Sequence, residues 1–288
     1  MHLHDKPNFD TDGRDWPHRA ASHFVEADGL NFHAQTMGEG PPLLLLHGTG
    51  ASTHSFRALM SDLATDHHVT AVDLPGHGFT GTPGAAHMGL PGVAHLVGAF
   101  AAKGAPPEAI IGHSAGAAVA LRMALDGHVA PRHIVGFNAS LRPFAGAAGP
   151  LFSTMAKALF VNPLVPKVFA ATASRRRVRN LLESTGSRIT DEDVALYGAL
   201  FRRSGHVAGA LAMMAMWDLL PLQRDLSRLT CHMTLVAAAG DKMIPPVVAT
   251  QSAAKTPSAT VRHIRRLGHL AHEEDPAGAA ALIREVIG

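Results

Sequence analysis

The chain has 288 residues, of which 47% are hydrophobic and 17% are charged, and its formal net charge is +2. This composition allows a sizeable buried core in one large α/β domain with an insertion or in two small domains, and the near-neutral charge argues against nucleic-acid binding. The single cysteine, Cys231, excludes an internal disulfide and fits a reducing compartment.

The first half of the chain alternates between predicted strands and helices. Residues 1–20 are expected to form an irregular arm, and 24–26 pairs with 30–36 in a hairpin around the turn signal Asp28-Gly29. Apolar runs predict buried strands at residues 43–46, 69–72, 109–111 and 133–137. Helical spacing predicts helices at residues 54–64, 90–100 and 117–125. Such alternation predicts a mostly parallel sheet with helices on both faces.

The alternation stops between residues 141 and 225. Helix-like stretches replace it at residues 151–160, 174–182, 191–203 and 206–220. We interpret 141–225 as a helical cap inserted into an α/β core that comprises residues 21–140 and 226–288. The strand pattern resumes at His232, and a further helix is predicted over residues 277–287.

The predicted cap is more basic than the rest of the chain. It contains 11 Lys and Arg against 6 Asp and Glu, whereas the remainder has a net charge of −3. This charge permits contact of the cap with an anionic small molecule or with a membrane surface. The alternative is that the cluster Arg175–Arg177 and Arg179 forms an ordinary solvated helix face.

The segment Gly112-His113-Ser114-Ala115-Gly116 joins the predicted strand 109–111 to the predicted helix 117–125. A G-x-S-x-G segment at such a place forms a sharp turn with the serine at its tip, and the small residues let the helix pack against the strand. Ser114 is therefore a candidate nucleophile if a base and an acid reach it. His113 is not expected to be that base, because its side chain should point elsewhere on the turn.

Two later segments supply the candidate acid and base. Asp241 follows the apolar run 235–239, and His269 lies between Gly268 and Leu270. The order Ser, Asp, His and the position of the residues just past strands are typical of a catalytic triad. We therefore predict Ser114, Asp241 and His269 as catalytic residues, with Asp241 orienting the imidazole. The alternative is that these positions are ordinary turns, and His272 is expected to be structural.

Two stretches are candidates for contacting the substrate. The loop after strand 43–46 is predicted to place the backbone N–H of Thr49 beside that of Ala115, so that both stabilise an oxyanion. The alternative is a simple glycine-rich turn. His47 and Gly48 in this loop, and Met213, Met216 and Trp217 in the cap, are predicted substrate contacts, although methionine and aromatic residues more often pack a core.

Other motifs favour neither a cofactor nor a metal. The segment 76–81 matches G-x-G-x-x-G, but no helix is predicted directly after it and no acidic residue lies between Asp73 and Glu108. The sequence contains no P-loop motif. His269 and His272 have the spacing of zinc ligands but lack a clear third ligand.

The quoted segments resemble the motifs of the α/β-hydrolase superfamily over nearly the whole chain, from about Phe24 to Gly288. HGTGAS, DLPGHGFT, GHSAGAA, GDKMIPP and GHLAHEEDP are similar to its oxyanion, loop, nucleophile, acid and base motifs. The resemblance implies the α/β-hydrolase fold, with a mostly parallel eight-stranded sheet, helices on both faces and an inserted cap. Residues 16–19, 47–54, 112–125 and 205–220 also resemble the magnesium-chelatase accessory proteins (BchO) of bacteriochlorophyll biosynthesis.

Three functions follow as hypotheses. The first is a serine hydrolase of carboxylic esters associated with magnesium chelation, with a tetrapyrrole ester as substrate and magnesium chelatase as partner. The second is a non-hydrolytic accessory protein that delivers porphyrin. The third is C–C bond hydrolysis or perhydrolysis on the same scaffold.

Two observations favour a cytoplasmic location. The polar segment 1–7 has no apolar signal region. No run of 18 uncharged apolar residues predicts a membrane-spanning helix.

Overall fold

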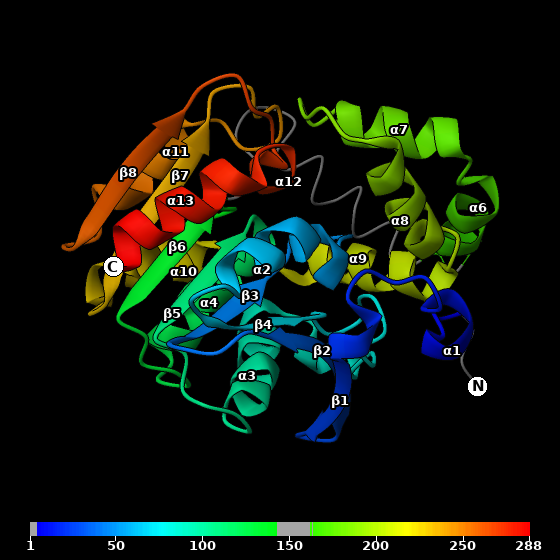
Figure 1. Ribbon diagram of the computed structural model, residues 1–288, viewed down its shortest axis with the longest axis horizontal. Coiled ribbons are helices and arrows are strands. Elements are labelled where there is room, and N and C mark those ends of the chain that lie inside the picture. The colour runs from blue at the N-terminus through cyan, green and yellow to red at the C-terminus, as the bar shows by residue number, and fades with distance from the viewer. Residues whose placement is uncertain (1–4, 143–161, 163) are drawn as a thin grey trace.

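The computed structural model describes residues 5–142, 162 and 164–288 of the chain. An eight-stranded sheet runs through the molecule in the order β1-β2-β4-β3-β5-β6-β7-β8 (Figure 1). Strands β3 to β8 are parallel, and β2 is antiparallel to both β1 and β4, which confirms the predicted mostly parallel sheet. The strands are β1 (Ser22–Ala27), β2 (Leu30–Met37), β3 (Pro42–Leu46), β4 (His68–Val72), β5 (Ala109–His113), β6 (His133–Phe137), β7 (His232–Ala238) and β8 (Ala259–Ile264).

The hairpin of β1 and β2 turns at Asp28 and Gly29. Both residues have positive φ, of 48° and 72°. Positive φ at both central residues is the geometry of a type I′ turn, whose twist matches that of paired strands. The structure therefore confirms the predicted hairpin, with Ala27 opposite Leu30.

Different helices cover the two faces of the sheet. Leu44 and Leu46 of β3 belong to one core cluster, and Leu43 and Leu45 belong to the other, because successive side chains of a strand point to opposite faces. This explains the continuous apolar run in a strand that is buried on both faces. The first cluster includes residues of α3 (Leu90–Ala101), α4 (Ala115–Leu125), α10 (Leu220–Asp225) and α11 (Val247–Ala253), and the second includes residues of α2 (Arg57–Leu63) and α13 (Pro276–Ile287).

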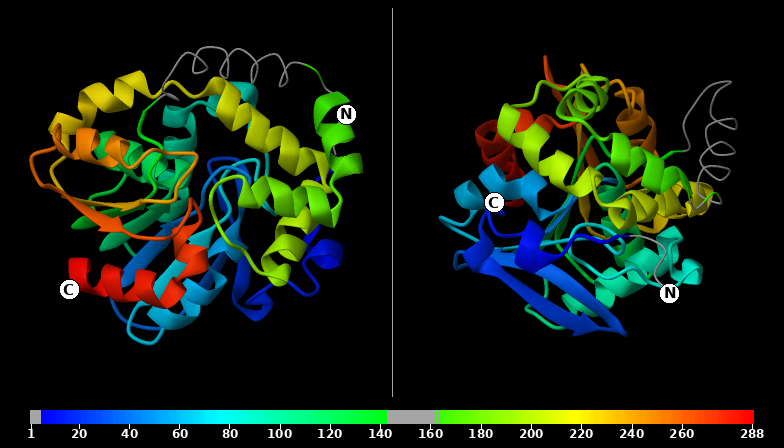
Figure 2. Two further views of the ribbon diagram at one scale, coloured as in Figure 1. Left: turned by 90° about the horizontal axis from the view of Figure 1, so that it is seen from above. Right: turned by 90° about the vertical axis from the view of Figure 1, so that its right-hand side faces the viewer.

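The cap helices lie together on one side of the molecule, away from α13 (Figures 1 and 2). A capping box of Thr190 and Asp193 begins helix α8, because each side chain accepts a backbone N–H of the other residue. The helix predicted at residues 151–160 lies outside the described residues. The cap helices are α6 (Leu164–Thr172), α7 (Arg175–Glu183), α8 (Asp191–Phe201) and α9 (Ser204–Met216).

Two features of the cap differ from the prediction. Helix α6 was not predicted, and the helix predicted over 206–220 ends at Met216, where Trp217 becomes extended. Pro221 explains the break, because its ring would clash with the carbonyl of Trp217 in a continuous helix. The Asp218 carboxylate accepts the N–H of Leu220, the first residue of the short helix α10, at 2.9 Å.

The N-terminal arm is more ordered than expected. It contains α1 (Phe9–Asp12) and the 3₁₀ turn η1 (Arg19–Ala21). Arg203, between α8 and α9, binds the carboxylates of Asp5 and Asp12 at 2.7 and 2.5 Å. The arm therefore packs against the cap through ion pairs that the local sequence pattern does not reveal. The remaining short elements are η2 (Thr53–Phe56), η3 (Ala85–His87), η4 (Leu226–Arg228) and α12 (Ala271–Glu274).

Within the described ranges, no single helix has the length and apolar character needed to cross a bilayer. Only the pair formed by α9 and the following stretch Leu220–Arg228 reaches that composition, and it is bent by 58°.

The cap helix α9 crosses the loop after β4 at Gly209 and Gly76. A Cβ atom on Gly209 would lie 2.0 Å from the carbonyl oxygen of Gly76, so a side chain there would push the helix away. We expect Gly209→Ala to lower the free energy of unfolding by about 1–3 kcal/mol in denaturant titrations. Gly84→Ala is the control, because its Cβ would meet nothing within 4 Å. Equal stability of the two variants would contradict this packing.

Candidate active site

Ser114 lies at the tip of a sharp turn between β5 and α4. Its φ and ψ are 49° and −111°, a conformation that non-glycine residues rarely adopt. The Ser114 N–H donates to the carbonyl of Phe137 at 2.9 Å, which ties the turn to β6. A Cβ atom on Gly116 would lie 2.0 Å from the carbonyl oxygen of Leu46, so α4 can approach β3 this closely only with glycine there. The strained turn is thus held by its surroundings.

The structure brings Ser114, His269 and Asp241 together. His269 Nε2 lies 3.1 Å from Ser114 Oγ, and His269 Nδ1 lies 2.8 Å from Asp241 Oδ2. The Asp241 side chain is fully buried, and its Oδ1 accepts the backbone N–H groups of Met243 and Ile244 at 2.7 and 2.9 Å. If Nδ1–H donates to the carboxylate, Nε2 is left to accept the hydroxyl proton. This arrangement can activate a serine hydroxyl.

Two side chains that the sequence analysis did not assign hold the His269 loop. The amide Nδ2 of Asn138, just after β6, donates to the carbonyls of Gly268 and His269 at 3.0 and 2.9 Å. Its Oδ1 accepts the N–H of Ala238 at 2.8 Å, at the end of β7. His113 Nε2 donates to the same His269 carbonyl at 2.9 Å. A polar residue directly after the apolar run 133–137 was the only signal for Asn138.

The two residues predicted to supply the oxyanion donors line the cavity that contains Ser114. Thr49 and Ala115 both line the same cavity as Ser114 and His269. Ala115 is the first residue of α4, so its N–H has no partner within the helix. The Thr49 hydroxyl donates to Met213 Sδ at 3.2 Å, which links the oxyanion loop to α9.

A cavity of about 870 Å³ lies between the core and the cap, and Ser114 and His269 line it. Three of the five predicted substrate contacts, Gly48, Met213 and Trp217, are among its lining residues. The cavity is also lined by Ser140, Arg142, Thr185, Tyr197, Met214 and Asp218.

His47 and Met216 are not among the lining residues. His47 is fully buried, its Nδ1 donates to the carbonyl of Gly48 at 2.8 Å, and its Nε2 accepts the N–H of Leu74 at 2.9 Å. His47 therefore stabilises the loop that follows β3. Met216 lies about 200° around α9 from Met214, which lines the cavity, because each helical residue turns by about 100°.

Glu273 is a buried carboxyl group that joins the cap to the His269 loop. Its Oε1 accepts hydrogen bonds from Tyr197 of α8 at 2.8 Å and from Ser55 of η2 at 2.6 Å. Its Oε2 is buried without a partner among the described residues. Burial raises the pKa of Glu273 to about 7, although the two hydrogen bonds oppose the shift. His272, next to it, is also buried, and burial lowers its pKa to about 3.

The raised pKa of Glu273 makes stability depend on pH. The folded protein holds this proton more tightly than the unfolded chain, so the contribution of Glu273 is full below about pH 4.5 and is lost as pH rises through about 7. We expect the free energy of unfolding of Glu273→Gln, measured by thermal unfolding, to fall less steeply between pH 5 and 8 than that of the wild type. The difference between the two proteins over this range should reach up to roughly 3 kcal/mol. Other titrating groups, including His272, are common to both proteins. Parallel pH profiles for the two would contradict the assignment.

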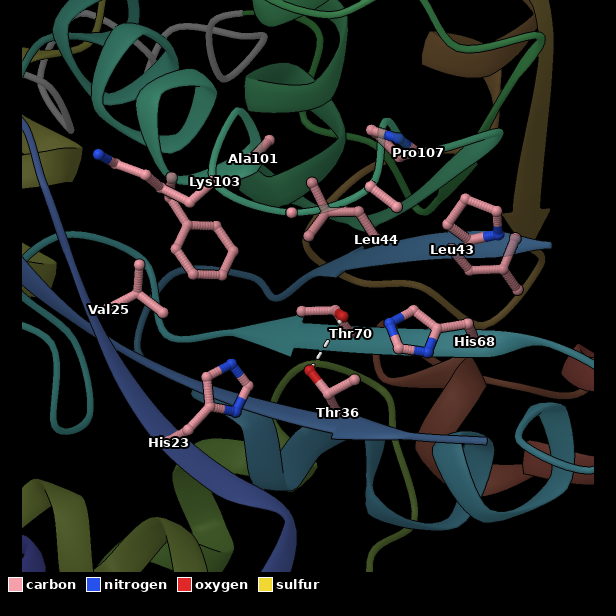
Figure 3. A pocket seen from close by; sticks show the side chains of 14 residues that line it. His23, Val25, Thr36, Leu43, Leu44, His68, Thr70, Ala101, Lys103 and Pro107 are labelled. Atoms are coloured by element: carbon pink, nitrogen blue, oxygen red, sulfur yellow. Dashed lines mark hydrogen bonds between the residues drawn. The ribbon is translucent and has the colours of Figure 1, made fainter. Parts of the chain in front are cut away.

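A second cavity, of about 330 Å³, lies at the opposite edge of the sheet, beside the first residues of β3 and β4 and the end of α3. Figure 3 shows Thr36 and Thr70 on neighbouring strands, and their hydroxyls are 3.1 Å apart. His23 and Lys103 are exposed at its rim. None of the described residues that line this cavity combines a nucleophile with a hydrogen-bonded base, so the first cavity is the candidate active site.

The G-x-G-x-x-G segment is not followed directly by a helix. Residues 76–81 form a turn closed by a hydrogen bond of 2.8 Å from the N–H of Gly76 to the carbonyl of Gly81, and α3 begins only at Leu90. Across residues 5–142 and 164–288, no group of three His, Cys, Asp or Glu side chains has the geometry to hold a metal ion.

Comparison with known proteins agrees with this geometry. The model of the alpha/beta hydrolase family matches residues 43–282. The chain belongs to the alpha/beta hydrolase family. The match spans the loop of Thr49, the turn of Ser114 and the loops of Asp241 and His269.

Individual relatives are similar to this chain over most of its length. The magnesium-chelatase 30 kDa subunit of Rhodobacter capsulatus is 40% identical over 272 residues, which cover 93% of this chain and 95% of that protein. A pimeloyl-[acyl-carrier protein] methyl ester esterase of Chromobacterium violaceum is 26% identical over 88% of this chain and 97% of that protein. The solved structure of the epoxide hydrolase CorEH has a TM-score of 0.79 at 19% identity, covers 92% of this chain and 97% of that chain, and supports the fold alone.

Proposed function

We propose that the protein is a serine hydrolase that cleaves carboxylic esters, with Ser114 as nucleophile, His269 as base and Asp241 as the acid that orients it. The observation that carries the proposal is the pair of contacts of the His269 imidazole, 3.1 Å to Ser114 Oγ and 2.8 Å to Asp241 Oδ2. Membership in the alpha/beta hydrolase family supports it. The similarity to methyl ester esterases favours ester chemistry.

The reaction proceeds in two halves. His269 takes the proton of Ser114 as Oγ attacks the ester carbonyl, and then gives it to the departing alkoxide, which leaves as an alcohol. Water attacks the resulting acyl-serine with His269 taking its proton; the bond to Ser114 Oγ then breaks, His269 returns the proton to Oγ, and the free acid leaves. The N–H groups of Thr49 and Ala115 stabilise the oxyanion, and each such donor is worth about 3 kcal/mol in the transition state.

The similarity to a magnesium-chelatase subunit suggests where this hydrolase acts. We infer that it works alongside magnesium chelation in bacteriochlorophyll biosynthesis, in the cytoplasm and in contact with the chelatase. A tetrapyrrole ester is then the proposed substrate, because it is flat and apolar and the cavity of about 870 Å³ is lined largely by apolar side chains. The basic cap, residues 141–225, is the proposed contact for an anionic membrane surface.

A second candidate function is porphyrin delivery without hydrolysis. The observation that favours it is the name of the relative, which is a chelatase subunit and not an esterase. C–C bond hydrolysis and perhydrolysis would use the same Ser114, His269 and Asp241. Assays with p-nitrophenyl esters, with C–C substrates and with peroxide distinguish these reactions from ester hydrolysis.

Hydrolysis is tested with p-nitrophenyl esters and an active-site serine probe. We expect Ser114→Ala to lower kcat/KM at least about 10³-fold and to abolish labelling, and Asp241→Asn to lower kcat about 10⁴-fold through the wrong imidazole tautomer. Ser61→Ala is the control, because Ser61 is exposed on α2 and does not line the cavity.

Two outcomes would argue against hydrolysis by Ser114. Labelling of Ser114→Ala as strong as that of the wild type would remove Ser114 as nucleophile. Full pigment synthesis in cells that carry Ser114→Ala, together with saturable binding of protoporphyrin IX, would favour delivery.

A further inference from the structure

Most polar side chains of the catalytic cavity are already engaged within the protein. The Tyr197 hydroxyl donates to Glu273 at 2.8 Å, and the Trp217 indole N–H donates to the carbonyl of Met88 at 3.0 Å. The Thr185 hydroxyl donates to the carbonyl of Leu182 at 2.6 Å. These groups therefore present their apolar parts to a ligand and offer it few hydrogen-bond donors.

Arg142 is different, because it is the only Lys or Arg among the described residues that line this cavity. Its guanidinium is always charged and carries five N–H donors in a fork that matches a carboxylate. It is half-buried, so its charge acts in a medium less polar than water.

The backbone places Arg142 close to the proposed nucleophile. The N–H of Ser140 donates to the carbonyl of Ser114 at 3.1 Å. Two residues of chain span at most about 7 Å, so the Cα of Arg142 lies within that distance of the Cα of Ser140. The long side chain of Arg142 can therefore reach a group bound next to the reacting ester.

Asp218 is the acidic residue among the described residues that line this cavity. Asp218 is exposed, in the break between α9 and α10, and its Oδ1 accepts the N–H of Leu220. A ligand anion is therefore repelled at Asp218 and attracted at Arg142.

We propose that Arg142 binds a free carboxylate of the substrate, so that the preferred substrate is a large apolar monoester that keeps one ionised carboxyl group near the ester. This inference rests on the proposed hydrolase function and narrows its substrate class. An arginine–carboxylate pair that is partly shielded from water is strong and is often bidentate, whereas a methyl group in the same place cannot form this pair.

The test compares two pairs of esters, and the members of each pair differ by one carboxylate group. One pair is mono-p-nitrophenyl suberate and p-nitrophenyl octanoate, which differ in the acyl group, and the other is 4-acetoxybenzoate and phenyl acetate, which differ in the leaving group. We expect the wild type to prefer the anionic ester of at least one pair by about 10-fold or more in kcat/KM. Arg142→Gln should lower kcat/KM for that ester about 10- to 100-fold and leave the neutral ester within about twofold.

Matched variants separate binding from general damage. Arg142→Lys keeps the charge but loses the fork, so it should retain part of the preference. Arg176→Gln removes an exposed charge of α7 that does not line the cavity and should change neither ester. Equal kcat/KM for both members of both pairs in the wild type would overturn the proposal, as would an equal loss on all four esters in Arg142→Gln.

A binding measurement keeps this inference distinct from the proposed hydrolysis. Ser114→Ala protein is titrated with octanoate and with octanol by calorimetry, which needs no turnover. Tighter binding of octanoate, lost in the Ser114→Ala/Arg142→Gln double variant, supports the carboxylate site even if no ester is cleaved. Equal binding of octanoate and octanol overturns the site even if esters are cleaved.

Discussion

The site depends on the hydrogen bonds that tie together the ends of β6 and β7 and the loop that follows β8. Asn138 donates to two carbonyls of the His269 loop and accepts an N–H at the end of β7. Because parallel strands end at one edge of the sheet, these short bonds can fix loops that are far apart in the sequence. The imidazole of His269 is then held between Ser114 and Asp241 with little freedom to rotate.

Hydrogen bonds join the cap to the His269 loop. Leu270 donates its N–H to the Ser187 hydroxyl at 2.8 Å, and Arg188 donates its N–H to Glu274 at 2.9 Å. Tyr197 reaches Glu273 from the same side. A movement of the cap would therefore strain the loop that carries His269, so access to the cavity and the geometry of the site are mechanically connected.

The relatives of this chain include a magnesium-chelatase subunit and a methyl ester esterase. The features that would distinguish such functions lie in the cavity and not in the turn of Ser114. Among the described residues, the lining is apolar apart from a few groups, and Arg142 is its only Lys or Arg. Substrate choice is therefore expected to depend on this positive charge and on the shape of an apolar space, to which side chains of α9 such as Met213 and Met214 can adapt.

The sequence by itself determined the alternation of strands and helices as far as β6, the Ser114 turn and the β1–β2 hairpin, because each depends on local periodicity or on a turn residue. It could not determine that His47 is enclosed, that Met216 faces away from the cavity, or that Asn138 joins three loops, because burial and long-range hydrogen bonds arise only when distant segments pack. Pro221 was a local signal for the end of α9, and the helical periodicity of 206–220 outweighed it. Tertiary structure alone decided which polar side chains of the cavity were left to meet a ligand.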